Sequence, residues 1–254
     1  MFKKIILLIT IFSLVVYSCS SKKNILYLQD VSVDTNYKAE YETYTIKTDD
    51  ILKVDILAKN KDISLEFNPQ LALNQGISKD VLLFQGYQVD SNGNISLPEI
   101  GKIKAEGFTL TELRNFIYDY LVSNNILINP IVDIKILNSH FTIIGEVNNP
   151  GRYDFLENNL NIFEAIGMAG DLTINGVRDD IKIIREMNGN KNVRKLDLTK
   201  VDLLNNPYFQ IRSGDIIVIN PNNSRVKNAG IIGNSGTLLT LLSFILSSII
   251  VINN

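Results

Sequence analysis

Residues 87–113 read YQVDSNGNISLPEIGKIKAEGFTLTEL, and the fold class predicted for the first half of the chain rests on this stretch. The turn-forming residues 90–93 (DSNG) separate short alternating apolar runs, which predicts a hairpin. Thr109 and Glu112 have the spacing of a capping box, and apolar residues recur at helical intervals as far as Leu121. A hairpin followed by a capped helix is typical of an α+β domain.

Further strands complete a first domain, which we place at residues 43–138. Short alternating runs at residues 44–46 and 51–56 precede the hairpin, and a strand in residues 129–137 (NPIVDIKIL) follows the helix. Residues 58–80 have no sustained periodicity and therefore predict an inserted loop.

A second domain is predicted over residues 140–221. Residues 141–155 (FTIIGEVNNPGRYDF) predict two strands around an Asn-Asn-Pro-Gly turn. A capped helix from Asn161 to Gly170 follows, and a later hairpin turns at residues 188–190. Two strands, a helix and further strands follow one another in the order of a β-grasp module.

The composition excludes several classes of functional site. The chain has one Cys, one His and no Trp, which rules out an intrachain disulfide and Cys- or His-rich metal sites. We expect His140 to be a polar residue that begins a strand, because no nucleophile motif accompanies it. The predicted leader contains two of the 25 basic residues, so 23 remain against 27 acidic ones. A net charge of −4 does not favour binding to the negatively charged phosphates of nucleic acid. We also predict no cofactor.

The N-terminus has the pattern of a lipoprotein signal. Two lysines precede the apolar run 5–16, which is shorter than the about 20 residues that span a bilayer and fits a signal peptide over residues 1–18. Cys19 follows directly, and VYSC resembles a bacterial lipobox, whose cysteine is acylated. An ordinary signal peptide with an incidental Cys is the alternative. We predict lipidation at Cys19 and a linker over residues 19–42.

The C-terminus is uncharged and of membrane length, which predicts a membrane helix over residues 229–254. Residues 228–254 would span about 40 Å as a helix. Small and hydroxyl side chains share one sector of about 140°, leucines and isoleucines occupy the rest, and Phe244 and Val251 interrupt the sector. The sector contains Gly233, Gly236, Thr237, Thr240, Ser243, Ser247 and Ser248.

Three interpretations of this C-terminal pattern stay open. A single anchor helix needs no polar sector, and a helix pair would use the small residues for close packing. A ring of helices would turn the polar sector toward a water-filled pore. The residues alone favour packing and a pore about equally. The pore hypothesis assigns the lumen to Gly233, Gly236, Thr237, Thr240, Ser243 and Ser247.

Six blocks of the sequence resemble one family of envelope proteins. Residues 44–56 (YTIKTDDILKVDI), 87–113 and 129–136 (NPIVDIKI) are similar to the polysaccharide export domain of outer-membrane polysaccharide export proteins. Residues 142–155, 161–173 and 211–219 resemble the soluble-ligand-binding β-grasp (SLBB) module that follows it in that family. The common order of the blocks is more specific than any single motif. Long members have additional β-grasp units, whereas one is found here.

The resemblance implies an α+β protein with a polysaccharide export domain, one SLBB domain and a C-terminal transmembrane helix. It implies a homo-oligomeric ring in the cell outer membrane, anchored by lipid and with its domains in the periplasm. The implied role is passive export of capsular polysaccharide or exopolysaccharide through an α-helical barrel, which makes the pore the favoured interpretation of the C-terminus. The implied partners are the polysaccharide, outer-membrane lipid and an inner-membrane polysaccharide co-polymerase, often with a tyrosine autokinase.

Two functions from other classes are the alternatives. An envelope lipoprotein adaptor or glycan-binding module would dock a partner on the β-grasp unit and use the C-terminal helix only as an anchor. A glycan hydrolase would need two carboxyl groups roughly 5–10 Å apart in a cleft. The acidic residues lie mostly in predicted turns, where Asp is favoured for its own backbone hydrogen bonds. We therefore predict that the protein is not an enzyme.

Overall fold

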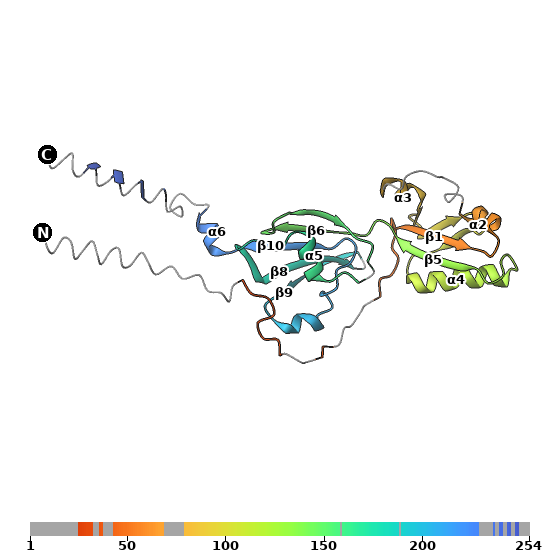
Figure 1. The fold of residues 1–254 in the computed structure, drawn as a ribbon, viewed down its shortest axis with the longest axis horizontal. Helices are drawn as coiled ribbons and strands as arrows, with labels where there is room; N and C mark the ends of the chain where they lie inside the picture. Colours follow the sequence, from red (N-terminus) through yellow and green to blue (C-terminus); the bar gives the residue numbers. More distant parts are fainter. Residues whose placement is uncertain are drawn as a thin grey trace.

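The computed structural model contains two mixed α/β units that follow each other along the long axis of the molecule (Figure 1). Residues 51–136 form the elements of the first unit, and residues 140–221 form most of the second. The mixed α and β class predicted from the sequence is confirmed. The structure describes residues 25–32, 36–37, 43–68, 79–157, 159–187 and 189–228, with residues 236, 239–240, 243–244 and 247–248 near the C-terminus.

The first unit combines a three-stranded sheet, a separate hairpin and a long helix. The sheet has the strand order β2-β1-β5, with both pairs antiparallel, and the hairpin joins β3 to β4. Its elements are β1 (Ile51–Leu57), α2 (Lys61–Phe67), α3 (Lys79–Gln85), β2 (Tyr87–Gln88), β3 (Asn94–Leu97), β4 (Gly101–Lys104), α4 (Leu110–Ser123) and β5 (Ile131–Ile136).

The core of this unit lies between the sheet and α4. Alternate residues of β1 are buried because successive side chains of a strand point to opposite faces. Helix α4 buries Leu113, Ile117 and Leu121, which are 0% exposed. Complete burial of such a side chain stabilises the fold by about 1.5–3 kcal/mol. The predicted capping box is confirmed, since the Thr109 hydroxyl accepts from the Glu112 amide and the Glu112 carboxylate accepts from the Thr109 amide.

The predicted hairpin around residues 90–93 was wrong in its strand pairing. The turn is present, and the Asp90 carboxylate accepts from the amides of Asn92 and Asn94. However, β2 pairs with β1, and β3 pairs with β4 after a second turn at residues 98–100. Gly101 has a φ of +85°, which suits glycine at the exit of that second turn.

The prediction of a loop over residues 58–80 was wrong for residues 61–67, which form α2, and for residues 79–80, where α3 begins. Asn60 caps this helix by accepting from the amide of Asp62. The buried side chain of Asn68 then accepts from the Ile56 amide at 2.9 Å and donates to the Ile56 carbonyl at 2.5 Å. An amide side chain thus takes the place of a neighbouring strand beside β1 and fixes the short helix there.

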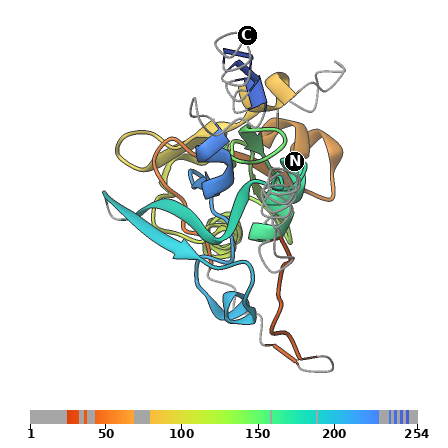
Figure 2. The same ribbon diagram turned by 90° about the vertical axis from the view of Figure 1, so that its left-hand side faces the viewer.

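The second unit is a five-stranded sheet that carries one helix, as the β-grasp prediction requires. The strand order is β7-β6-β10-β8-β9, with β10 parallel to β6 and the other pairs antiparallel. The β8–β9 hairpin extends from one side of the unit (Figure 2). The elements are β6 (His140–Gly145), β7 (Gly151–Asp154), α5 (Ile162–Met168), β8 (Gly176–Met187), β9 (Asn190–Leu196), the 3-10 helix η3 (Val201–Asn205), β10 (Ile216–Pro221) and α6 (Asn223–Asn228).

Helix α5 covers one face of this sheet and closes its core. Ile162, Ala165 and Ile166 of α5 are buried together with Ile181 and Ile183 of β8. The predicted helix start is confirmed, because the Asn161 side chain accepts from two amides of the first turn. His140 begins β6, as predicted.

An N-terminal strap, residues 25–30, packs on the second unit although the first unit follows it in the sequence. The sequence assigns these residues to a linker. The amides of Leu28 and Gln29 donate to the carbonyls of Leu198 and Thr199 at 3.0 and 2.7 Å. Leu28 has a φ of 44°, a left-handed conformation that is uncommon for leucine. The strap thus adopts a specific conformation against η3 and the end of β9.

Tyr27 fixes the strap by its side chain. The Tyr27 hydroxyl donates to the Asp171 carboxylate at 2.5 Å, and its ring meets the Phe163 ring edge-on at 5.8 Å. The guanidinium of Arg178 lies 5.8 Å from the centre of the same ring, within the range of a cation–π contact. Burial, with the Asp171 hydrogen bond as the second cause, raises the pKa of Tyr27 above its ordinary value.

The C-terminal residues are described at isolated positions only. Gly236, Thr240, Ser243 and Ser247 are helical. Among the described residues, no helix reaches the length and apolar character needed to cross a membrane. Most of the predicted membrane helix over residues 229–254 lies outside the described residues, so the helix stays a prediction.

Candidate functional site

The predicted pore-lining residues that the structure describes share one helical face and are exposed. Thr240 donates its hydroxyl proton to the Gly236 carbonyl at 3.1 Å, and Ser243 donates to Thr240 at 2.9 Å. Ser247 donates to Ser243 at 2.8 Å. A hydroxyl that donates to its own helix still has lone pairs that accept. This face therefore offers neutral hydrogen-bond acceptors to whatever lies beside it.

Three residues of the predicted sites lie outside the described residues. They are the predicted lipidation residue and two predicted pore-lining residues, Cys19, Gly233 and Thr237. Their roles stay predictions.

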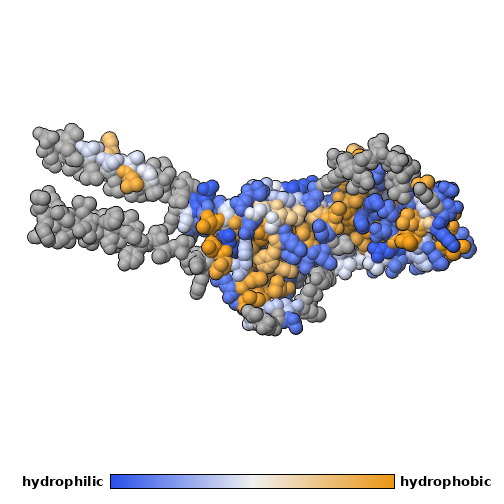
Figure 3. Space-filling model, viewed as in Figure 1, coloured by the Kyte–Doolittle hydropathy of each residue, from blue (hydrophilic) through white to orange (hydrophobic). Residues whose placement is uncertain are grey.

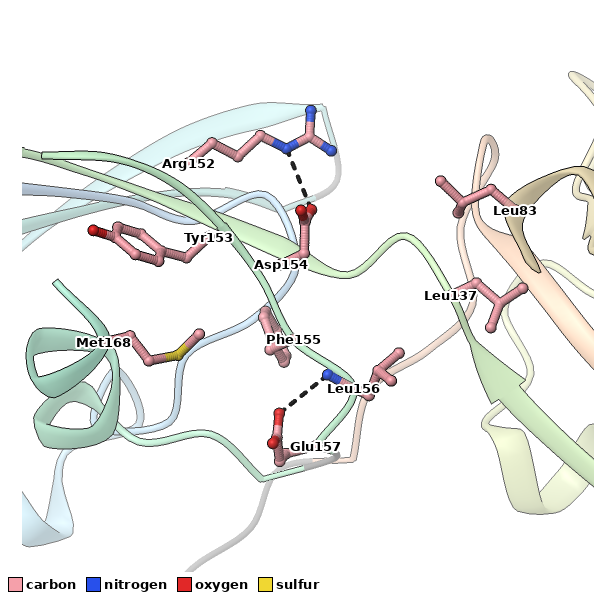
Figure 4. Close-up of a pocket in the computed structure, with 9 residues that line it drawn as sticks. All are labelled: Leu83, Leu137, Arg152, Tyr153, Asp154, Phe155, Leu156, Glu157 and Met168. Carbon is pink, nitrogen blue, oxygen red and sulfur yellow. Dashed lines mark hydrogen bonds and ion pairs between the residues drawn. The ribbon is translucent and has the colours of Figure 1, made fainter. Parts of the chain in front are cut away.

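A groove lies at the junction of the two units, where a short linker joins β5 to β6 (Figure 4). The Asn138 side chain accepts from the Ile51 amide and donates to the Asp49 carbonyl, both at 2.9 Å. On the other side, the Phe155 amide donates to the Ser139 carbonyl at 3.0 Å. These bonds attach the linker to the first strand of one unit and to the end of β7 in the other.

The groove has an apolar half of about 520 Å³. In Figure 4, Leu83 and Leu137 lie on the side of the first unit and Met168 lies on the side of the second. Leu156 is 66% exposed, which is high for leucine. Figure 3 shows apolar side chains gathered on the viewed face of the second unit and toward the junction. The lining residues are Leu83, Leu137, Arg152, Tyr153, Asp154, Phe155, Leu156, Glu157 and Met168.

Aromatic rings that pack on Phe141 support the wall of the apolar half. The ring centres of Phe141 and Tyr153 are 5.4 Å apart, and those of Phe141 and Phe155 are 6.1 Å apart. Tyr153 and Phe155 are two residues apart in one extended segment, so both side chains point to the same face. The rim carries an ion pair, in which Arg152 Nε lies 3.6 Å from Asp154 Oδ1.

The groove also has a polar half, of about 160 Å³. The two halves share residues 155–157, so the segment that follows β7 forms a ridge between them. Hydroxyl and amide side chains from both units line the polar half: Thr43, Tyr44, Thr111, Ser139, Asn159, Gln210 and Ser213. The side-chain oxygen of Gln210 is buried and has no hydrogen-bond partner among the described residues.

Three ionisable groups have shifted pKa values: Tyr44 and Arg212, which line the polar half, and Asp50, which accepts from Tyr44. Burial raises the pKa of Tyr44, and the charge of Asp50 adds to the shift. Burial also raises the pKa of Asp50, while hydrogen bonds from the Lys47 amide and the Tyr44 hydroxyl oppose the shift. Burial lowers the pKa of Arg212, and the charge of Asp215 opposes that change. The Tyr44 hydroxyl therefore stays protonated and donates to Asp50.

The groove presents apolar and hydrogen-bonding side chains, and the helical face presents hydroxyl groups. In the part of the chain that the structure describes, no three His, Cys, Asp or Glu residues come close enough to hold a metal ion. The groove was not predicted from the sequence. The alternation in residues 151–155 places Tyr153 and Phe155 on one face, but their neighbours from the first unit are distant in the sequence.

Comparisons with known proteins agree with this architecture. Residues 38–137 match the family model described as polysaccharide biosynthesis/export protein, and residues 140–195 match the SLBB domain. Together the two matches cover more than half of the chain and occur in the predicted order. The chain therefore carries the export domain and the SLBB domain in the order that the sequence predicts, and the resemblance to polysaccharide export proteins identified from the sequence is confirmed.

One curated relative gives this family a specific example. The chain is 27% identical over 203 residues to the EPS I polysaccharide export outer membrane protein EpsA of Ralstonia solanacearum. The alignment covers 76% of this chain and 52% of the relative. The chain thus spans about half the length of that relative.

Proposed function

We propose that the protein is an outer-membrane lipoprotein that oligomerises into a channel for export of capsular polysaccharide or exopolysaccharide. The observation that carries this proposal is the export domain followed directly by an SLBB domain. The name of the Ralstonia relative supports the outer-membrane location and the polysaccharide cargo. The protein acts as a passive conduit and needs no catalytic residue.

The position of the strap supports an orientation of the chain relative to the membrane. A stretch from Cys19 to Ile25 reaches at most about 20 Å. Lipidation at Cys19 would therefore hold the second unit near the outer membrane, and α6 also leaves that unit (Figure 1). The first unit lies at the opposite end of the long axis and would extend into the periplasm, toward an inner-membrane co-polymerase and its tyrosine autokinase.

The C-terminal residues would supply one helix of the channel wall from each subunit. A ring of helices satisfies every backbone hydrogen bond within its own segments, which a lipid environment requires. The exposed hydroxyls of Thr240, Ser243 and Ser247 would face the lumen and accept hydrogen bonds from a hydrated glycan. The leucine and isoleucine face would meet lipid.

Cysteine labelling tests the pore. Thr240→Cys and Leu242→Cys are made singly in chains that retain Cys19, and intact cells are treated with a membrane-impermeant maleimide. The two positions lie roughly 200° apart around a helix, so one should face the lumen and the other lipid. We expect labelling at position 240 and none at position 242. Equal labelling of both positions contradicts the pore.

A second candidate is a lipoprotein adaptor or glycan-binding module whose C-terminal helix is only an anchor. The groove between the units favours it, because a binding module needs such a site. The mass of the detergent-solubilised protein separates the two functions. A ring gives a multiple of the mass of the mature, lipidated chain, whereas an adaptor of this kind gives the mass of a single chain.

A further inference from the structure

The groove at the junction has the position and size of a ligand site. Ligand pockets commonly lie between domains and enclose roughly 300–1,000 Å³, and the apolar half alone encloses about 520 Å³. Its walls come from both units, with Leu137 and Thr111 on one side and Phe155 and Gln210 on the other. A ligand in the groove would therefore contact both units at once.

The polar half has hydrogen-bonding groups that the fold leaves unused. Within the described part of the chain, the side chains of Thr43, Thr111 and Asn159 make no hydrogen bond, although they line one small space. The buried side-chain oxygen of Gln210 is likewise unpaired. Native folds rarely leave a buried polar atom without a partner, and each case needs an explanation. A donor hydroxyl in the polar half would provide the partner.

The ridge between the halves adds an apolar surface to these polar groups. Leu156 is 66% exposed on the ridge, and the buried ring of Phe155 lies beside it and faces both halves. A sugar ring has the same two kinds of surface, since its C–H face is apolar and its edge carries hydroxyl groups. A purely apolar ligand would take the exposed hydroxyls of Thr43 and Thr111 out of water without a new partner and would leave Gln210 unpaired, which costs free energy for each group.

We propose that this groove binds a segment of the exported polysaccharide. A C–H face packs on Leu156 and Phe155, while sugar hydroxyls bond with Thr43, Thr111 and Gln210. This inference rests on the proposed function and names a site where the glycan is held. Because both units contribute walls, the bound glycan also fixes the two units relative to each other across the linker.

The direct test measures binding of oligosaccharides to the full chain in detergent. The probe is the glycan secreted by producing cells, cut by partial acid hydrolysis, and the readouts are calorimetry and saturation-transfer NMR. Thr111→Val removes an unpaired hydroxyl, and Leu156→Ala removes the apolar contact. Each should weaken binding about fivefold, the effect of losing one modest interaction. Thr142→Val and Ile174→Ala, which lie outside the groove, are the matched controls and should bind normally.

Two results overturn the site. One is equal binding by all four variants, and the other is no binding by the unaltered chain. Glycan secretion is measured in parallel in cells that lack the gene and in cells that carry each variant. If secretion depends on the gene while the groove variants bind and secrete normally, the site fails and the export function stands. If secretion does not depend on the gene, the export function fails.

A photocrosslink at position 156 identifies the occupant in cells. Replacing Leu156 with benzoylphenylalanine should give, after irradiation, a broad high-mass product that reacts with antibodies to the protein and stains for carbohydrate. A discrete product of twice the chain mass would identify a second copy of the chain as the occupant and overturn the proposal. A discrete product of another mass, without carbohydrate, would identify a different protein as the occupant and would also overturn the proposal.

Discussion

Arg185 and Asp215 form a buried ion pair inside the second unit, with 2.9 Å from Nε to Oδ1 and 2.7 Å from Nη2 to Oδ2. Their side chains are 3% and 0% exposed. The same guanidinium donates to the Gln210 carbonyl at 2.6 Å and lies 4.5 Å from the centre of the Tyr208 ring. Asp215 also accepts from the Arg212 amide at 2.9 Å. This pair therefore fixes the loop that supplies the polar wall of the groove.

Asp215→Asn should strongly destabilise the second unit. Removing one partner leaves a buried guanidinium uncompensated, which costs about 3–5 kcal/mol. The free energy of unfolding, measured by urea denaturation of the detergent-solubilised chain, checks this expectation. Lys195→Met breaks an exposed ion pair with Asp180 in the same unit and should cost less than about 1 kcal/mol. Similar costs for both variants would contradict a special role of the buried pair.

Gly145→Ala should disrupt the second unit far more than Gly214→Ala. Both glycines have left-handed φ values, +100° and +87°, so both variants incur backbone strain of about 1–2 kcal/mol. A Cβ at Gly145 would lie 1.9 Å from the Ile219 carbonyl oxygen, whereas a Cβ at Gly214 has nothing within 4 Å. Since β6 pairs with β10 at this point, the clash must separate two strands of the sheet. Thermal unfolding of the two variants measures the difference, and equal melting temperatures would contradict it.

Tyr27→Ala should release the strap. The variant loses the hydrogen bond to Asp171 and the ring contacts with Phe163 and Arg178. Hydrogen exchange should then accelerate at the Leu28 and Gln29 amides, whose acceptors lie in the second unit. Tyr27→Phe retains the ring and loses only the hydroxyl hydrogen bond, so the free energy of strap docking should fall by only about 1 kcal/mol. Tyr118→Phe, on the exposed side of α4, is the control, and unchanged exchange in Tyr27→Ala would contradict the docking.

Asp50→Asn should remove one component of the pH dependence of stability. Because the pKa of Asp50 is raised in the folded chain, the folded state binds this proton more tightly than the unfolded state. The stabilisation is complete below the ordinary pKa of 3.8 and is lost as the pH rises through the raised value. The unaltered chain should therefore gain stability relative to Asp50→Asn as the pH falls from neutral toward 3.8.

Urea titrations of both chains across this pH range measure that difference. Asp119→Asn removes a carboxylate exposed on α4 and is the control. A constant difference between the unaltered chain and Asp50→Asn at every pH would contradict the assignment of the effect to Asp50.

Local signals in the sequence predicted the elements that local chemistry controls. The capping residues Thr109 and Asn161 fix helix starts through bonds to amides within three residues, so their spacing was sufficient. The periodicity of the C-terminus likewise agrees with the helical state of Thr240 and Ser243. The β-grasp order followed from the sequence of strands and helix, because few topologies suit that order.

Features set by long-range partners were missed. Helix α2 depends on Asn68, which pairs with a strand that precedes the helix in the sequence. Strand β3 pairs with β4 and not with β2. Tertiary packing decides which strands pair and in which register, and the alternation of apolar and polar residues alone does not encode that choice. The groove brings Thr43 together with Ser213, and its existence depends on how two separately folded units meet.

The strap also determines the order in which the molecule can be completed during synthesis. Residues 25–30 emerge from the ribosome before the first unit, while their backbone partners at Leu198 and Thr199 emerge after it. The strap therefore lacks these backbone partners until the second unit has been made. A chain that stops before Leu198 lacks both of these acceptors, so the strap docks only when the second unit is present.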